Sequence, residues 1–316
     1  MYHIRNISRF LKDGAEALAD KITYLINLSL RTKVVPDCTK RAKVIPLYKK
    51  KSKLEVGNYR PVSVLTTMSK ILEKSVHVQV ESFCKQNGVI YSLQSGFRGC
   101  YSTDTCLMYL HDYIRNEVSK GNFVGLAMLD VQKAFDSVDH DMLSEKICLI
   151  GIDPEWFKSY LHARKQTVAI KDHLSSEKNI KYRVPQGSIL GPWCYLIYSN
   201  DISTSVTCKL LMYADDTILL ISNRDLAKVA SGLSREISNY FHWLTNNLLS
   251  MHMGKTEVIV LSLKRKRHLT KDFVIECQGK AIKPSDTVKY LGLSIDSTLS
   301  GETTVMLHFE QMYITS

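Results

Sequence analysis

The chain contains 316 residues, of which 45% are hydrophobic and 23% are charged, a balance that is typical of globular proteins and too apolar for a disordered chain. It carries 42 Lys and Arg against 31 Asp and Glu, and this formal net charge of +11 favours nucleic acid or an anionic membrane surface as a partner. Charged or amide side chains interrupt every apolar stretch before it reaches about 18 residues, which excludes a membrane-spanning helix.

The first half of the chain is predicted to be mainly helical. Apolar residues from Ile22 to Leu30 form a stripe that predicts a helix ending near Pro36, and "AKVIPLY" follows as a strand. The stretch from Val62 to Gly88 spaces its apolar residues as a helix does. Either Ser102 or Thr103 can cap a further helix.

The middle of the chain changes from a helical to a mixed pattern. "NFVGLAMLD" is predicted to be a buried strand that stops at Asp130, and a helix is predicted to start at Asp153. "QTVAI" and "KNIKYRV" are predicted strands around a polar turn, and an apolar helix follows from Ile189 to Tyr198. "CKLLMY" and "TILLIS" are two apolar strands that enclose the tight turn "ADD".

The last third combines one long helix with a strand-rich end. From Leu226 to Leu248, apolar residues recur every three or four positions and predict an amphipathic helix. "TEVIVLSL", "DFVIEC" and "TVKYLGLSI" are predicted strands. Because strands and helices alternate irregularly, we expect an α+β domain whose sheet is covered by helices on one side.

The eight cysteines follow no pairing or metal-binding pattern. They include no CxxC pair and no Cys/His cluster at zinc spacing, so we expect buried, small apolar side chains in a reducing compartment. The N-terminus lacks the pattern of a secretory signal, and we expect a nuclear or cytoplasmic protein rather than a secreted one. The basic run "KRKRH" fits a nuclear import signal, a solvated loop or the cap of a strand hairpin.

Three aspartates are predicted to lie at one end of a sheet. Asp215 and Asp216 are adjacent in a hairpin turn, where two anions repel each other, and we therefore expect a cation beside them. Asp130 ends another apolar strand and lies beside the hairpin if the two strands are neighbours. Three carboxylates provide the oxygen ligands that Mg²⁺ prefers, and two such ions support in-line phosphoryl transfer. Taken alone, the Asp-Asp pair is better explained by a polar turn, because this dipeptide is common in loops.

Seven ordered segments resemble one enzyme family. "LDVQKAFDSVDHDML", "VPQGSILGP", "YADDT", "KTEVIVL" and "KYLGLSID" resemble the palm motifs of reverse transcriptases of non-LTR (LINE-like) retrotransposons, and "GNYRPVSVLTTMSKILEK" and "QSGFR" resemble that family's finger segments. The resemblance implies an α+β right-hand polymerase of fingers and palm, with an antiparallel palm sheet covered by helices. It also implies an RNA-directed DNA polymerase that extends a DNA primer with dNTPs on an RNA template, using two Mg²⁺ ions, with Mn²⁺ as a substitute.

The same resemblance assigns catalytic and metal-binding residues. Asp130, Asp215 and Asp216 match the family's metal-binding triad, and Val131 would offer its backbone carbonyl to one metal ion. Lys255 matches a candidate proton donor to the pyrophosphate leaving group. Charge neutralisation without proton transfer is the alternative for this lysine.

Nucleotide-binding and primer-binding residues are assigned in the same way. The nucleotide-binding set also includes Val131, and its other members are Lys43, Arg60, Phe135, Gln186 and Gly187. The two cations would hold the triphosphate, and the aromatic ring would exclude a ribonucleotide 2′-OH. A solvated side chain is the alternative for Lys43, and core packing is the alternative for Phe135. The primer-binding turn consists of Tyr290, Leu291 and Gly292.

Motif positions suggest the domain boundaries. Residues 1–34 are expected to form an N-terminal helical extension, 35–120 the fingers, 121–262 the palm, and 263–316 the palm end with the primer-grip region. We expect the thumb to be largely absent and no endonuclease segment to precede Met1. Two rival interpretations stay open: a truncated element copy that binds nucleic acid without polymerising, and a related enzyme such as a group II intron maturase or a domesticated descendant.

Three positions depart from the family pattern. Arg183 stands where the family usually has Gly, "WCY" from Trp193 to Tyr195 replaces Leu-Leu-Phe, and a common Trp is absent near Cys38. We expect these departures to affect packing rather than the metal site. Asp136 also matches a family position, and we expect it to anchor the palm rather than to bind metal.

Overall fold

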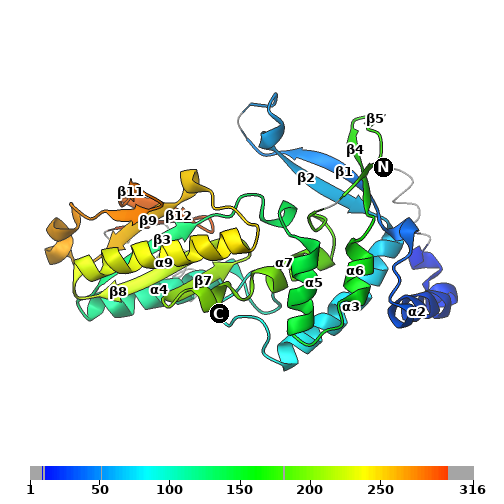
Figure 1. Ribbon diagram of the computed structural model, residues 1–316, viewed down its shortest axis with the longest axis horizontal. Coiled ribbons are helices and arrows are strands. Elements are labelled where there is room, and N and C mark those ends of the chain that lie inside the picture. Colours follow the sequence, from blue (N-terminus) through cyan, green and yellow to red (C-terminus); the bar gives the residue numbers. More distant parts are fainter. Residues whose placement is uncertain (1–8, 10, 51, 181, 298–316) are drawn as a thin grey trace. The chain divides into compact units, whose positions relative to one another are not determined.

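The computed structural model describes residues 9, 11–50, 52–180 and 182–297. Contacts divide the chain into two compact units that interleave along the sequence. The first unit comprises the chain up to Ile90 together with Lys133–Ser199, and the second comprises Tyr91–Gln132 together with the chain from Asn200 onward (Figure 1). The expected boundaries of extension, fingers and palm stay predictions. Within the described ranges, no helix is long and apolar enough to cross a membrane.

The first unit contains one mixed sheet in the order β2-β1-β4-β5, with β6 also pairing β4. β1 pairs antiparallel with β2 and parallel with β4. The strands are β1 (Arg41–Tyr48), β2 (Tyr59–Leu65), β4 (Lys165–Ile170), β5 (His173–Leu174) and β6 (Lys178–Asn179). The strand predicted over "KNIKYRV" is wrong after Asn179, because the N–H groups of Arg183 and Val184 donate to the carbonyls of Val138 and Phe135 instead of to a strand. Lys181 lies outside the described residues.

The helix predicted from Val62 begins later than expected. Val62 to Leu65 belong to β2 and pair with β1, with Val62 opposite Ile45. Thr66 then caps α3 (Thr67–Gln86) by accepting a hydrogen bond from the Ser69 N–H group. The prediction was wrong because a short apolar run fits one helical turn as well as a strand.

Three other helices of the first unit lie where the sequence predicts them. They are α2 (Ala15–Thr32), α6 (Glu155–Leu161) and α7 (Leu190–Ser199). α6 starts after Asp153 and Pro154 and buries Trp156, Phe157 and Tyr160. The unit also contains α5 (His140–Leu149) and short 3₁₀ turns at Asp37–Thr39, Val56–Asn58 and Ala134–Asp136.

The second unit is built on an antiparallel sheet in the order β7-β8-β3-β9. The strands are β3 (Phe123–Leu129), β7 (Lys209–Tyr213), β8 (Asp216–Asn223) and β9 (Glu257–Leu261). Every residue of β3 is buried, which confirms the buried strand predicted from its continuous apolar run. This strand is central, because it pairs with β8 on one side and β9 on the other.

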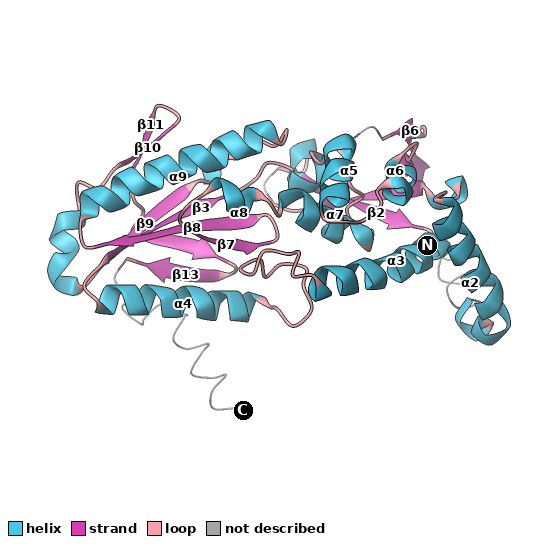
Figure 2. Cartoon of the chain, turned by 60° about the horizontal axis from the view of Figure 1, so that its bottom comes forward, coloured by secondary structure: helices cyan, strands magenta, loops and turns pink. Residues whose placement is uncertain are grey.

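Helices cover both faces of this sheet, so the prediction of one covered face is wrong. Leu126 belongs to one apolar core with the buried side of α4 (Thr103–Ser119). On the opposite face, Gly125 lies under α9 (Leu226–Asn246), where a Cβ atom would approach the Leu233 side chain to 2.7 Å. Figure 2 shows the sheet between these two helices. A strand that is apolar on both faces, such as β3, is expected to be covered on both.

Two hairpins and several short elements complete the second unit. They are α8 (Ile202–Ser205), β10 (Ile275–Cys277), β11 (Lys280–Ile282), β12 (Thr287–Tyr290), β13 (Leu293–Asp296) and 3₁₀ turns at Met253–Lys255 and Lys264–Thr270. "TVKYLGLSI" therefore forms a hairpin rather than one strand, because Leu291 and Gly292 both adopt positive φ and turn the chain. The basic run "KRKRH" lies in the 3₁₀ segment between β9 and β10 instead of capping a hairpin.

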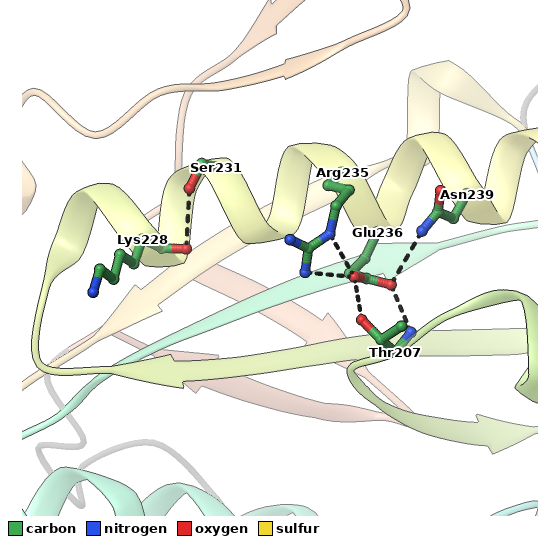
Figure 3. A network of polar contacts seen from close by, with 6 residues as sticks. All are labelled: Thr207, Lys228, Ser231, Arg235, Glu236 and Asn239. Atoms are coloured by element: carbon green, nitrogen blue, oxygen red, sulfur yellow. Dashed lines mark hydrogen bonds and ion pairs between the residues drawn. The ribbon is translucent and has the colours of Figure 1, made fainter.

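Glu236 of α9 anchors that helix to the segment that enters β7. Its carboxylate is fully buried and accepts hydrogen bonds from the Thr207 N–H at 2.8 Å and the Thr207 hydroxyl at 2.6 Å, while Arg235 pairs with it at 2.9 Å (Figure 3). Burial alone would raise the pKa of Glu236, but the contacts with Thr207 and Arg235 outweigh it and hold the pKa below its ordinary value. This contact fixes the helix over the hairpin that follows Thr207.

The cysteines only partly follow the prediction that they are buried. Cys84, Cys106, Cys194 and Cys277 are buried, as expected. In contrast, Cys208 is only half-buried and three other cysteines are exposed. These are Cys38, Cys100 and Cys148.

Candidate active site

Three carboxylates lie at one edge of the second unit's sheet, namely the edge where β3 ends and β8 begins. β3 and β8 pair antiparallel with Leu129 opposite Thr217. Asp130, which follows Leu129, and Asp216, which precedes Thr217, therefore lie at the same end of the strand pair. Asp215 occupies the turn that joins β7 to β8. The sheet therefore brings the hairpin beside the end of β3, as the strand pattern predicts.

The hairpin turn itself is tight and strained. Tyr213 pairs with Asp216, which leaves Ala214 and Asp215 as the two turn residues. Ala214 has a φ of 58°, in the left-handed region that favours glycine. Holding a residue with a Cβ atom in this region costs about 1–2 kcal/mol, so neighbouring contacts must hold the turn.

Negative charge accumulates at this edge. The pKa of Asp216 is raised to about 6, first by desolvation of its carboxyl and then by the negative charges of Asp215 and Asp130, against the opposing charge of Lys255. Residue Asp216 nevertheless stays exposed to solvent. A cation bound here would relieve the repulsion between the carboxylates.

Lys255 contacts one of these carboxylates directly. It ends the 3₁₀ turn Met253–Lys255, and its Nζ lies 2.7 Å from Oδ2 of Asp130. The lysine side chain is 59% exposed, so it can leave the carboxylate without disturbing the core. In the free protein, the lysine neutralises part of the charge of the cluster.

The backbone around Val131 is held by a short antiparallel contact. An isolated bridge pairs Val131 with Met251. On either side, the His252 N–H donates to the Asp130 carbonyl at 2.8 Å, and the Gln132 N–H donates to the Ser250 carbonyl at 2.8 Å. The Val131 side chain is buried, so only its backbone is suited to contact a metal ion.

The carboxylates at this edge fit Mg²⁺ by their chemistry, since they provide the oxygen ligands that this ion prefers. Among the described residues, no group of three or more His, Cys, Asp or Glu side chains is placed so that it could hold a metal ion. In proteins, Mg²⁺ is usually held by one or two carboxylates together with waters and substrate phosphates. The shared sheet edge, the oxygen ligands and the repulsion at Asp216 agree with such an open site.

Lys43 and Arg60 share one face of a strand pair in the first unit. Arg60 lies opposite Leu47, and Lys43 lies opposite Val64. Because paired residues share a face and side chains alternate along each strand, both cations project from the same face. Both are exposed, whereas Ala42 on the other face is buried. This arrangement could bind a polyphosphate.

Gln186 and Gly187 lie against the free edge of β2. The Ser63 N–H donates to the Gln186 carbonyl at 2.7 Å. Gly187 has a φ of 105°, and a Cβ atom there would approach the Ser63 carbonyl oxygen to 2.6 Å. The glycine is therefore required by its contact with the protein's own strand, and the half-buried Gln186 side chain is held beside that strand.

Phe135 and Asp136 also belong to the first unit. The half-buried Phe135 ring stacks on Tyr195, with 5.0 Å between ring centres. Tyr195 is the last residue of the "WCY" segment and stands where the family pattern has Phe, so an aromatic partner for Phe135 is kept. Asp136 lies 3.3 Å from the Arg183 guanidinium, a contact that fits a structural anchor.

The predicted primer-binding turn presents its backbone more than its side chains. Tyr290 is buried, and its hydroxyl lies 3.6 Å from the Cys106 Sγ atom. Gly292 is exposed and has a φ of 91°. At this turn, Leu291 and Gly292 are therefore at least partly open to solvent, whereas the Tyr290 side chain packs inward.

Sequence reasoning assigned no individual role to Gln94, although its segment "QSGFR" was recognised. Its side chain is buried and bonds to Ala214 in the carboxylate hairpin. The available signal was an amide side chain at the start of a short segment that also contains Gly96 and ends in Arg98. The partner, 120 residues away, was not visible in the sequence.

Comparisons with known proteins identify the family and the fold of the chain. A family model described as reverse transcriptase (RNA-dependent DNA polymerase) matches residues 48–295. The chain is 27% identical over 290 residues to the probable RNA-directed DNA polymerase from transposon BS of Drosophila melanogaster, covering 88% of this chain and 32% of that protein. It is 26% identical over 291 residues to the RNA-directed DNA polymerase from mobile element jockey of the same species, covering 88% and 31%. It thus spans about a third of the length of these relatives.

A solved structure shows the fold independently. The apo telomerase from Candida Tropicalis, truncated from its C-terminal domain, matches with a TM-score of 0.56 at 16% identity, covering 84% of this chain and 55% of that one. This likeness confirms the predicted right-hand polymerase fold. The named relatives come from mobile elements, which confirms the resemblance found in the motifs. Since the family model covers most of its length, the chain belongs to the reverse transcriptase (RNA-dependent DNA polymerase) family.

Proposed function

We propose that the chain catalyses RNA-templated DNA synthesis as part of a non-LTR retrotransposon protein. The observation that carries the proposal is the placement of Asp130, Asp215 and Asp216 at one sheet edge in a chain of the reverse transcriptase family. The relatives named as RNA-directed DNA polymerases support it. The substrates would be a DNA primer, an RNA template and dNTPs.

The three carboxylates would hold two Mg²⁺ ions, or Mn²⁺ in their place, together with the Val131 carbonyl. When bound, such ions activate the attacking 3′-oxygen and stabilise the leaving pyrophosphate. The chain's contribution is to fix the carboxylates on paired strands, so that little reorganisation is needed when substrate arrives.

Lys255 has two candidate roles in this reaction. Its 2.7 Å contact with Asp130 supports charge neutralisation in the free protein. Once the carboxylate is engaged elsewhere, the exposed lysine would be free to approach the pyrophosphate and donate a proton to it. Either role places a cation where negative charge develops.

Residues of the first unit would bind the incoming nucleotide. Lys43 and Arg60, on one strand face, would hold the triphosphate, with Arg60 able to contact two oxygens at once. Gly187 permits close contact with β2 and so helps to hold the backbone of Gln186 against that strand. The Gln186 side chain would form a hydrogen bond with the nascent base pair. Phe135 would contact the sugar and exclude a 2′-OH.

The primer would meet the turn Tyr290–Gly292 through its backbone. In the corresponding division of the chain, residues 35–120 would act as fingers and 121–262 as palm, with the primer grip in 263–316. This division describes roles and differs from the two compact units, which interleave in sequence.

Primer extension tests the proposal. Asp215→Asn should lower Mg²⁺-dependent extension of a DNA primer on an RNA template more than about 100-fold, since losing even an outer-shell partner of a metal ligand costs roughly 10- to 100-fold. Asp272→Asn, at an exposed site of the same unit, serves as the matched control and should extend like the parent.

Measuring the binding of the primer–template duplex distinguishes a loss of catalysis from a loss of nucleic-acid binding. The proposal expects Asp215→Asn to bind primer–template like the parent while failing to extend it. Equal extension by parent and Asp215→Asn would contradict the metal assignment. Binding without extension by the parent itself would favour the interpretation of a copy that only binds nucleic acid.

A further inference from the structure

The side chain of Gln94 forms hydrogen bonds with the hairpin that carries two of the carboxylates. The residue is 3% exposed. Its Nε2 donates to the Ala214 carbonyl at 3.1 Å, and its Oε1 accepts from the Ala214 N–H at 2.9 Å and the Gly96 N–H at 2.8 Å. One amide group thus binds both backbone polar groups of the residue that precedes Asp215.

The backbone around Gln94 runs beside β7 and fixes the amide in place. The Ser95 N–H donates to the Met212 carbonyl at 2.8 Å, and the Met212 N–H donates to the Leu93 carbonyl at 3.0 Å. These bonds make a parallel bridge between Gln94 and Met212. The Arg98 guanidinium also donates to the Gln94 carbonyl at 2.9 Å. These hydrogen bonds fix the backbone of Gln94 and thereby restrict the position of its side chain.

Ala214 is the residue that requires such support. Its φ of 58° is unfavourable for a residue with a Cβ atom, and the amide of Gln94 bonds to the groups on both sides of its Cα. Gly96 permits the close approach, because a Cβ atom there would come within 2.1 Å of the Ala214 nitrogen. The absence of a side chain at Gly96 and the amide group of Gln94 therefore both contribute to the contact with Ala214.

We propose that Gln94 is a positioning residue for the metal-binding carboxylates, acting through the left-handed conformation of Ala214. The inference rests on the proposed function, because Asp215 and Asp216 need fixed positions only if they bind metal. Mg²⁺ demands near-ideal octahedral geometry, so a loosened turn weakens metal binding. Nucleic-acid binding depends on exposed cations elsewhere and should be unaffected.

The variant Gln94→Met tests the proposal, because methionine has a similar size but lacks the amide donor and acceptor. The control is Gln79→Met, at an exposed position where the amide donates to Ser75 of its own helix. In the metal-free protein, hydrogen exchange should become faster at the amides of residues 212–217 in Gln94→Met. Binding of Mn²⁺ to the free protein, followed by electron paramagnetic resonance, should weaken roughly 10- to 100-fold.

The primer-extension activity of Gln94→Met should also show weaker metal binding with unchanged binding of nucleic acid. The Mg²⁺ concentration for half-maximal primer extension should rise while the Kd for primer–template stays within about twofold of the parent. A folded Gln94→Met variant with parental hydrogen exchange and parental Mn²⁺ affinity would overturn the inference. A proportional loss of metal and duplex binding would do so as well, since that pattern indicates general unfolding.

A second variant applies if Gln94→Met does not fold. Gln94→Glu keeps the shape of the side chain and its accepted bonds from Ala214 and Gly96 but loses the donated bond. It should show faster exchange in the hairpin, and parental exchange would overturn the inference. Failure of this inference can be distinguished from failure of the proposed function. If the proposed function is wrong, the parent will not extend primers or Asp215→Asn will extend them normally, whatever the Gln94 variants show.

Discussion

Arg183 adopts a φ of 84°, in the region that favours glycine, although it carries a long side chain. Its guanidinium lies 3.3 Å from Asp136 and also contacts the Gln166 side chain. These contacts offset the backbone strain, and they explain how an arginine is accommodated where the family resemblance leads us to expect glycine. The departure therefore affects a structural contact in the first unit and leaves the carboxylates in the second unit untouched.

Substitutions at Arg183 should separate strain from side-chain contact. Arg183→Ala and Arg183→Gly both lose the contacts with Asp136 and Gln166, but only glycine relieves the positive φ. We expect the glycine variant to be more stable than the alanine variant by about 1–2 kcal/mol in urea unfolding.

Arg224 provides the matched control, since it is exposed and is not among the residues with positive φ. There, glycine should be less stable than alanine, because it adds freedom to the unfolded chain. An alanine variant at Arg183 as stable as the glycine variant would show that the backbone there is unstrained.

Residue roles were predictable where charge and residue type restrict the chemistry. Adjacent Asp215 and Asp216 beside an apolar strand already indicate a cation. The ion pair of Lys255 with Asp130 and the amide contact of Gln94 join residues 125 and 120 positions apart, respectively. Such contacts depend on strand register, which the sequence pattern did not determine.

At the scale of elements, Glu117 joins α4 to β8. Its carboxylate accepts hydrogen bonds from Lys120 at 2.7 Å, from the Ser222 hydroxyl at 2.8 Å and from the Asn122 amide at 2.7 Å. The contact with Lys120, followed by that with Ser222, lowers the pKa of Glu117 to about 2, against an opposing effect of desolvation. Helix and sheet are thus linked by a charged group.

Glu117→Gln should lower stability in a pH-dependent way. Because the folded pKa lies below the ordinary value of 4.5, the carboxylate stabilises the fold fully above that value, and its contribution is lost as the pH falls through about 2. In urea unfolding near pH 7, we expect a loss of about 1–3 kcal/mol, and the difference from the parent should shrink below pH 4.5.

Glu155→Gln is the control for this prediction. Glu155 contacts Lys158 with the same spacing and the same 2.7 Å distance, but both side chains are about half exposed. We expect a small effect at any pH, because exposed ion pairs contribute little. An equally small effect of Glu117→Gln at neutral pH would contradict the role of the α4–β8 contact.

The elements themselves were predictable to different degrees. Continuous apolar runs identified β3, β7 and β8, and the long amphipathic pattern identified α9, because period and length agreed. Val62 to Leu65 were misassigned, since four residues are too few to separate a strand from a helical turn. The second covered face of the sheet was missed because a run buried on both sides does not indicate what packs on each side.

At the scale of the whole molecule, the proposed chemistry draws on both compact units. The carboxylates and Lys255 belong to the second unit, whereas Lys43, Arg60 and Gln186 belong to the first. The motifs alternate between the units along the sequence, so their order alone predicted the family but not this division. Composition favours a polyanionic partner, since the net charge is +11, and this stays a prediction.

The most direct test of the central claim is incorporation of the first nucleotide in a single turnover, with saturating DNA primer annealed to an RNA template and with Mg²⁺. The parent and Asp272→Asn should add one dNTP at the same rate, while Asp130→Asn and Asp216→Asn should be slower by more than about 100-fold at unchanged duplex binding. Addition at the parental rate by either carboxylate variant would contradict the assignment of this sheet edge as the catalytic metal site.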